Sequence, residues 1–148
     1  MGKTTVVNQF GESFDNFLSI NLEKREAKTL MESTDDVKRL LPNIFLYCNV
    51  ERKNGRTLLF IDEIQNSPKT VMLLRYFYED IPELYVIAAG SLLETMLDRH
   101  ISLPVGRVEY MALHPCTFTE FLSAMKEDRF IDLILNATLS PAFHERMN

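Results

Sequence analysis

The stretch TLLFID, residues 57–62, constrains the fold of this chain more than any other. Four apolar residues in a row, without alternation and followed by an acid, are typical of a strand that is buried on both faces. The stretch LYVIAAGS, residues 84–91, has the same character. Strands of this kind occur in sheets that helices cover on both sides, so the two runs predict an α/β domain with a parallel sheet.

Helical and strand-like segments alternate along the rest of the chain, and 148 residues suit one domain spanning 1–148. Ser67 and Pro68 are typical of a helix start, and Thr117 with Glu120 matches a capping box. The expected helices span 3–10, 25–47 with a new start at Ser33, 67–80, 91–99 and 117–125, and the other expected strands span 16–22 and 107–113.

Composition excludes some classes of protein and leaves others open. The net charge of -5 gives no argument for nucleic acid as a partner, which stays open. No apolar run approaches the roughly 20 residues that span a bilayer, and no secretion signal is recognisable at the start. Cys48 and Cys116 lie outside any metal-binding or redox motif. They predict two buried, reduced thiols in a cytoplasmic protein.

The sequence GKTT, residues 2–5, matches the second half of a phosphate-binding loop. In such a loop Gly2 contributes backbone to the phosphate cradle, Lys3 reaches the β- and γ-phosphates, and Thr4 binds Mg²⁺ through its hydroxyl. Thr5 would lie near the α-phosphate. The match is only four residues long, and an ordinary exposed N-terminus explains it equally well.

Two acids follow the apolar run that ends at residue 62. The strand carries Asp62 and Glu63 to its carboxyl end, where ligands bind in α/β sheets. Asp62 is therefore a candidate to hold Mg²⁺ through water, and Glu63 a candidate to polarise the water that attacks the γ-phosphate. The alternative is that these acids cap a helix or sit in a solvated turn.

Ser91 and Arg107 complete the set of candidates. Ser91 ends the second buried strand, where it could contact the γ-phosphate or the attacking water, or simply cap the next helix. Arg107 could stabilise transition-state charge, within the chain or in a neighbouring subunit of a homo-oligomer. A surface arginine at a strand start is the alternative, and Arg99 is a weaker candidate for the same role.

Taken together, four motifs resemble the AAA+-type P-loop ATPases that carry an AAA_14 domain, often followed by a domain of the DUF4143 type. The matching stretches are GKTT (2–5), LLFIDEIQ (58–65), AAGSLL (88–93) and VGRVEYMALHPCTFTEFL (105–122). The resemblance covers nearly the whole chain. It implies a P-loop NTPase fold of the ASCE or AAA+-like kind, a three-layer sandwich around a parallel sheet.

The resemblance also implies ATP binding and Mg²⁺-dependent hydrolysis, with Lys3, Thr4, Asp62 and Glu63 in the roles given above. Ser91 would be the sensor at the end of its strand. A guanine-reading motif is not recognisable, and His100, His114 and His144 lack ligand spacing, so a GTPase and a metal enzyme are less favoured.

Two departures from the family pattern concern the ends of the chain, and we expect truncation at both. The family's C-terminal domain is not among residues 1–148. Residues 1–148 include neither the family's first strand nor the first half of its phosphate loop. That strand would lie between the strands at 84–90 and 107–113. We therefore expect this polypeptide to hydrolyse ATP poorly. The alternative is a non-catalytic remnant that acts only through protein contacts. The apolar helices at 71–78 and 117–125 could then be partner surfaces, although packing in the core is the preferred interpretation of both.

Overall fold

The computed structural model describes residues 2–90 and 106–127. The chain divides into two compact units, Met1–Ala112 and Leu113–Asn148, which are taken in turn here. The expected helix at 91–99, and Ser91 and Arg99 with it, lie outside the described residues.

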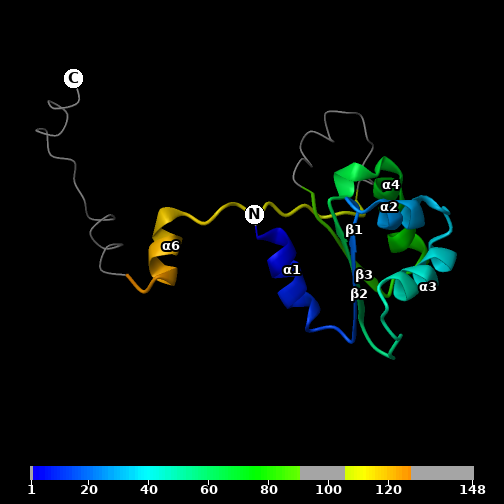
Figure 1. Cartoon of the computed structure of the whole chain (residues 1–148), viewed down its shortest axis with the longest axis horizontal. Helices are drawn as coiled ribbons and strands as arrows, with labels where there is room; N and C mark the ends of the chain where they lie inside the picture. The colour runs from blue at the N-terminus through cyan, green and yellow to red at the C-terminus, as the bar shows by residue number, and fades with distance from the viewer. Residues whose placement is uncertain (1, 91–105, 128–148) are drawn as a thin grey trace, which may run out of the picture. The chain divides into compact units, whose positions relative to one another are not determined.

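The first unit is built on a three-stranded parallel sheet (Figure 1). Its strands are β1 (Asn16–Asn21), β2 (Thr57–Asp62) and β3 (Leu84–Ala88), in the order β1-β2-β3. All of β2 except its first residue is buried, as its continuous apolar run predicts. The predicted α/β fold with a parallel sheet is thus confirmed. The expectation that the strand at 84–91 is buried on both faces is wrong, because β3 stands at the end of the strand order and none of its residues is buried.

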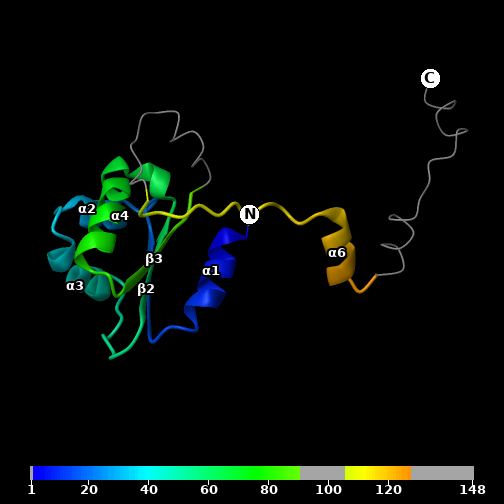
Figure 2. The ribbon, with the colours of Figure 1, turned by 180° about the vertical axis from the view of Figure 1, so that it is seen from behind.

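Helices cover both faces of this sheet. The helices α2 (Arg25–Glu32), α3 (Val37–Tyr47) and α4 (Pro68–Asp80) lie on one face, and α1 (Lys3–Gly11) lies on the other (Figures 1 and 2). The hydrophobic core forms beneath α2, α3 and α4. Its strand residues are Leu18, Ile20, Leu59 and Ile61. The three layers agree with the expected sandwich.

Local capping sets the helix starts. Ser67 caps α4 by accepting a hydrogen bond from the Thr70 amide, and Pro68 is the first helical residue, as predicted. The start expected at Ser33 is wrong, because Ser33 closes the end of α2. Asp36 caps α3 instead, since its Oδ1 accepts from two amides of the first turn, whereas the Ser33 hydroxyl donates to the Leu30 carbonyl.

The strand expected at 107–113 is not formed, since residues 108–113 have no regular secondary structure. A strand exists only when a neighbour accepts and donates its backbone hydrogen bonds. Among the described residues the sheet has the order β1-β2-β3, and none of these strands pairs with this segment. Alternation of side chains alone therefore did not suffice to make this segment a strand.

The second unit contains α6 (Phe118–Ala124). Its predicted capping box is confirmed, because Thr117 Oγ1 accepts from the Glu120 amide while Glu120 Oε2 accepts from the Thr117 amide. Phe118, Phe121 and Met125 on this helix and just after it are 65%, 54% and 61% exposed. Among the described residues of α6 none is buried.

Both cysteines are free thiols, but only one is sheltered. Cys48 is half-buried, and burial raises the pKa of its thiol. Cys116 is exposed, so the expectation that it is buried is wrong. Within 2–90 and 106–127, no helix is long and apolar enough to cross a membrane.

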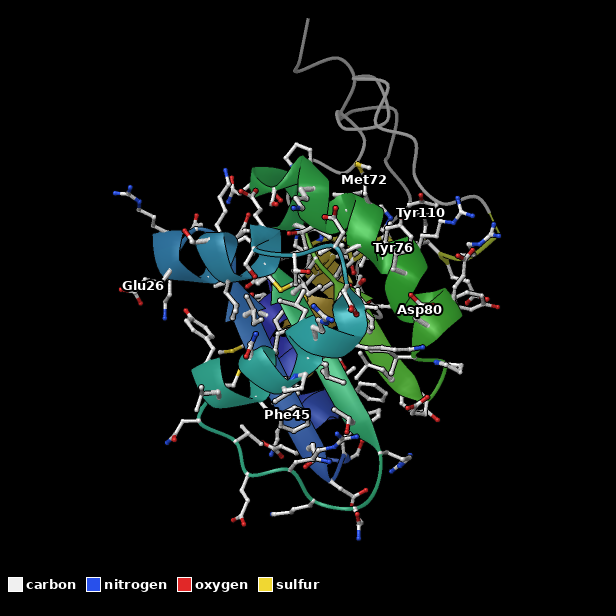
Figure 3. All side chains as sticks on the ribbon, turned by 90° about the vertical axis from the view of Figure 1, so that its right-hand side faces the viewer. Glu26, Phe45, Met72, Tyr76, Asp80 and Tyr110 are labelled. Atoms are coloured by element: carbon white, nitrogen blue, oxygen red, sulfur yellow. The ribbon has the colours of Figure 1, made fainter. Side chains whose placement is uncertain are left out.

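The burial of individual side chains on α4 predicts how their replacement affects the free energy of unfolding. Phe77 is 1% exposed in the core, whereas its neighbour Tyr78 is 60% exposed, and Figure 3 shows Met72 and Tyr76 on the outer side of the same helix. Phe77→Ala should lower the free energy of unfolding by about 3–5 kcal/mol, through lost burial and a cavity. Urea denaturation measures this. Tyr78→Ala is the matched control, and equal losses for the two variants would contradict the described packing.

Candidate functional site

The alternation of side chains along β2 decides which face carries Asp62. Leu59 and Ile61 point into the core beneath α2, α3 and α4. Leu58, Phe60 and Asp62 alternate with them and so face the side that α1 covers. Asp62 is the last residue of the strand and is 6% exposed. Its carboxylate therefore lies at the carboxyl end of β2, on the side of α1.

The first turn of α1 meets this carboxylate. Thr4 Oγ1 donates a hydrogen bond of 2.8 Å to Asp62 Oδ2, although 58 positions separate the two residues. The other oxygen, Asp62 Oδ1, accepts from the Glu63 amide at 3.0 Å. Gly2 precedes the helix with a φ of 88°, a left-handed conformation that glycine adopts without steric cost. This turn places the Thr4 hydroxyl and the Asp62 carboxylate side by side.

Lys3 reaches the neighbouring strand. Its Nζ donates a hydrogen bond of 2.5 Å to the carbonyl oxygen of Gly90, just beyond β3. Backbone bonds hold this stretch beside the end of β2, since the Ala89 amide donates to Ile61 and the Ala89 carbonyl accepts from Ile64. The start of α1 therefore contacts the carboxyl ends of both β2 and β3.

Glu63 marks the point where the chain leaves β2. Its φ of 55° and ψ of 44° are left-handed, which costs a residue with a side chain on the order of 1–2 kcal/mol. The short 3-10 helix η1 (Ile64–Asn66) follows at once. Within it, Gln65 Nε2 donates a hydrogen bond to Glu63 Oε2. The Glu63 carboxylate is thus held at the same edge of the sheet as Asp62.

The remaining predicted residues lie as follows. Gly2 accepts the hydrogen bond of the Val6 amide through its carbonyl, and Thr5 is exposed in the first turn of α1. Ser91 lies outside the described residues. The structure therefore brings Lys3 and Thr4 to the strand ends, with Thr5 next to them in sequence.

Arg107 lies elsewhere in the first unit. Its Nε donates a hydrogen bond of 2.8 Å to Glu79 Oε1, in the last turn of α4. Arg75 also bonds this carboxylate. The hydrogen bonds from Arg75 and Arg107 lower the pKa of Glu79, and the one from Arg75 has the larger effect. Since α4 spans 13 residues, or about 20 Å, its last turn is remote from Glu63. In this structure Arg107 is not brought to the phosphate loop.

A family model described as an AAA domain, AAA_14, matches residues 1–122. The chain belongs to this AAA domain family. No curated protein and no solved structure matches the chain. Membership assigns nucleotide binding at the level of the family, and the matched range includes Lys3, Thr4, Asp62 and Glu63.

The oxygen donors of this AAA domain suit a particular kind of metal site. Thr4 offers a hydroxyl and Asp62 a carboxylate, 2.8 Å apart. In the part of the chain that the structure describes, no group of three or more His, Cys, Asp or Glu side chains could hold a metal by itself. Mg²⁺ is usually held by one or two protein oxygens, waters and phosphate oxygens of a substrate. The residues present therefore fit Mg²⁺ that arrives with a nucleotide.

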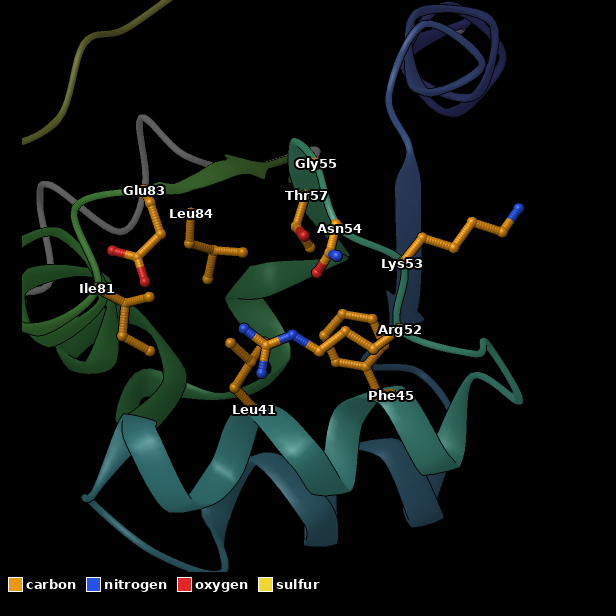
Figure 4. Close-up of a pocket in the computed structure, with 10 residues that line it drawn as sticks. All are labelled: Leu41, Phe45, Arg52, Lys53, Asn54, Gly55, Thr57, Ile81, Glu83 and Leu84. Carbon is orange, nitrogen blue, oxygen red and sulfur yellow. The ribbon is translucent and has the colours of Figure 1, made fainter.

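A separate hollow lies where β2 and β3 begin, at the opposite end of the strands from Asp62 (Figure 4). It is lined by Thr57 and Leu84, the first residues of β2 and β3, so it is remote from Asp62. Arg52 lies beside Phe45 there, with its guanidinium carbon 5.8 Å from the ring centre. The candidate site of the AAA domain is thus not this hollow but the edge where β2 and β3 end.

Two residues of the site were missed by the sequence reasoning. Gln65 binds Glu63, and Gly90 binds Lys3 through its carbonyl. Gln65 stands two positions after Glu63, within the motif LLFIDEIQ, so its spacing to the acid was visible. The role of Gly90 was not visible, because a backbone carbonyl carries no sequence signal.

Proposed function

We propose that this AAA domain binds ATP with Mg²⁺ at the carboxyl ends of β2 and β3. We also propose that Glu63 takes part in the hydrolysis of ATP. The observation that carries the proposal is the meeting of Thr4 Oγ1 with Asp62 Oδ2 at 2.8 Å. Nothing local requires a threonine and an aspartate 58 positions apart to touch. A shared Mg²⁺ with oxygen ligands explains why both are placed there.

Lys3 and the start of α1 would hold the phosphates. The Lys3 ammonium is already within reach of the strand ends, at 2.5 Å from the Gly90 carbonyl. In binding, it exchanges this carbonyl for a phosphate oxygen, which is a stronger acceptor because it is charged. The first amides of α1 have no partner within the helix and so point toward an anion at its N-terminus.

Thr4 and Asp62 would hold Mg²⁺, which neutralises charge on the phosphates when it is bound. Glu63 is the candidate general base, because a carboxylate at this edge can accept the proton of the attacking water. Ser91 and Arg107 stay predictions as sensor and as a cation for the transition state. If Arg107 acts in a neighbouring copy, it must first leave Glu79.

The polypeptide of residues 1–148, tested alone, should bind ATP weakly. Successive backbone amides ahead of the lysine form the anion cradle of a phosphate loop, and here only Met1 and Gly2 stand before Lys3. We therefore propose slow hydrolysis for this polypeptide. A chain lengthened upstream by a strand and the rest of the loop should bind more tightly. Equal, tight affinity for both chains would contradict this part of the proposal.

A second candidate function is contact with another protein without catalysis. The exposed side chains of Phe118, Phe121 and Met125 favour it. The helix α4 is divided in this respect, because Val71, Leu73 and Phe77 are buried in the core. Its outer side exposes Met72, Tyr76 and Tyr78. The two candidates differ in whether replacing Glu63 changes the rate of ATP hydrolysis.

Thr4→Val tests the metal part of the proposal. Without the hydroxyl, affinity for Mg-ATP should fall by about 10-fold, whereas affinity for ATP measured in excess EDTA should not change. Titration with a fluorescent ATP analogue gives both values. Thr29→Val is the matched control, because Thr29 is exposed in α2, where it bonds the Arg25 carbonyl. An equal loss with and without Mg²⁺ would show that Thr4 does not act through the metal.

A further inference from the structure

We propose that Gln65 is a positioning residue that holds the Glu63 carboxylate in place for hydrolysis. This inference rests on the proposed function, because it assigns a role around the same general base. Gln65 is not among the residues proposed above to bind the phosphates, to hold the metal or to act as the general base. The geometry that supports it joins Gln65 to Glu63 on one side and to Gly90 on the other.

The bond between Gln65 and Glu63 fixes the orientation of the amide. A carboxylate can only accept hydrogen bonds, so the nitrogen of the Gln65 amide must face Glu63 Oε2. This bond occupies one of the two carboxylate oxygens. The second oxygen, Oε1, belongs to the same planar group, so the bond also restricts where Oε1 points. A carboxylate held in this way is ready to accept a proton from a water at one defined place.

The backbone at Gly90 lies beside the oxygen of the Gln65 amide. A Cβ built on Gly90 would lie 2.5 Å from Gln65 Oε1, so the end of the Gln65 side chain would have to move. Gly90 has no positive φ, so its effect is to leave room for the Gln65 amide rather than to permit a special backbone conformation. The amide of Gln65 therefore packs directly on the backbone at the end of β3.

Backbone bonds keep this arrangement rigid. The Ile64 amide donates to the Ala89 carbonyl at 3.0 Å, which joins η1 to the stretch that follows β3. The Gly90 carbonyl in turn accepts from Lys3 Nζ. Gln65 thus lies between the general base and the residue that contacts the phosphate lysine. A substitution at Gly90 should therefore move the Gln65 amide and, through it, the Glu63 carboxylate.

Gln65→Met tests the role, since methionine has a similar volume but no amide donor. The expected result is a loss of about 10- to 100-fold in kcat, the effect of one hydrogen bond to a charged group, with the Kd for Mg-ATP within about two-fold. Gln9→Met is the matched control, because Gln9 is exposed on α1. An unchanged kcat, or a fall in affinity that accounts for the whole effect, would overturn the proposal.

Gly90→Ala is the second variant, because its new Cβ must displace the Gln65 amide. It should lower kcat to a similar extent while Glu63 and Gln65 are both present. In the Gln65→Met background, Gly90→Ala should cause little further loss, since neighbours that act through one contact are not additive. Losses that multiply fully in the double variant would show that Gly90 does not act through Gln65.

A spectroscopic measurement separates this inference from the proposed function. The side-chain amide resonances of Gln65, assigned by their loss in Gln65→Met, should shift in Glu63→Ala even without nucleotide. Unshifted resonances would overturn the contact and the proposal. A shift together with wild-type hydrolysis by Glu63→Gln would leave the contact intact and contradict the proposed function. Loss of hydrolysis in Glu63→Gln with full activity in Gln65→Met would overturn only the inference.

Discussion

Replacing Lys3 with alanine is expected to weaken Mg-ATP binding by about 10- to 150-fold. In the proposed site the ammonium makes a charge-assisted bond with the phosphates, and such bonds contribute about 1.5–3 kcal/mol. Lys3 is placed for this role, because its Nζ lies at the ends of β2 and β3, 2.5 Å from the Gly90 carbonyl. Titration of the unchanged chain and the variant with a fluorescent ATP analogue measures the change.

Lys38→Ala is the matched control for this variant. Lys38 is an exposed lysine on α3, on the opposite face of the sheet from α1, so its removal changes the net charge equally. It should leave the affinity for Mg-ATP within about two-fold. Lys3→Arg keeps the charge but replaces a compact ammonium with a larger planar group, so partial affinity is expected. Binding by Lys3→Ala as tight as by the unchanged chain would refute a role for Lys3 in holding phosphate.

Replacing Glu63 with glutamine should abolish most hydrolysis while leaving binding intact. Glutamine keeps the shape of the side chain but cannot take a proton from water. The loss of a general base costs about 10²- to 10⁴-fold in rate. The Kd for Mg-ATP should stay within about two-fold, because in the proposed site Lys3, Thr4 and Asp62 hold the nucleotide and its metal. Phosphate release at saturating ATP gives the rate, and the same titration gives the affinity.

Glu83→Gln is the control for this second variant, since Glu83 is exposed ahead of β3 at the far edge of the sheet. Its rate should equal that of the unchanged chain. Equal rates for Glu63→Gln and the unchanged chain would contradict hydrolysis at this site. They would then favour the alternative in which the chain acts only through protein contacts.

The parts of the fold that follow from local pattern were predictable. The apolar run before Asp62 predicted β2, and the helix expected at 3–10 corresponds to α1 (Lys3–Gly11). Capping at Ser67 and Thr117 gave two further helix starts. The helix does not begin at Ser33, because Asp36, three residues later, is an equally good capping residue. The Asp36 carboxylate accepts the hydrogen bonds of the first-turn amides.

The strand expected at 107–113 failed for a non-local reason. Whether a segment pairs depends on a neighbour far away in sequence, which alternation of side chains does not reveal. The same limit applies to Arg107. Its sequence position does not reveal that it bonds Glu79, which lies 28 positions earlier on α4. Its role near phosphate stays a prediction.

By itself, the sequence determined the type of sheet, the helix starts marked by Ser67 and Thr117, and the position of Asp62 and Glu63 at a strand end. These features depend on apolar periodicity and on side chains near one another in the chain. Only the tertiary structure decided that Thr4 meets Asp62, that Lys3 meets the Gly90 carbonyl, and that Gln65 holds Glu63. The first two contacts depend on strand register and on how α1 packs across the sheet, and the third on the left-handed turn at Glu63.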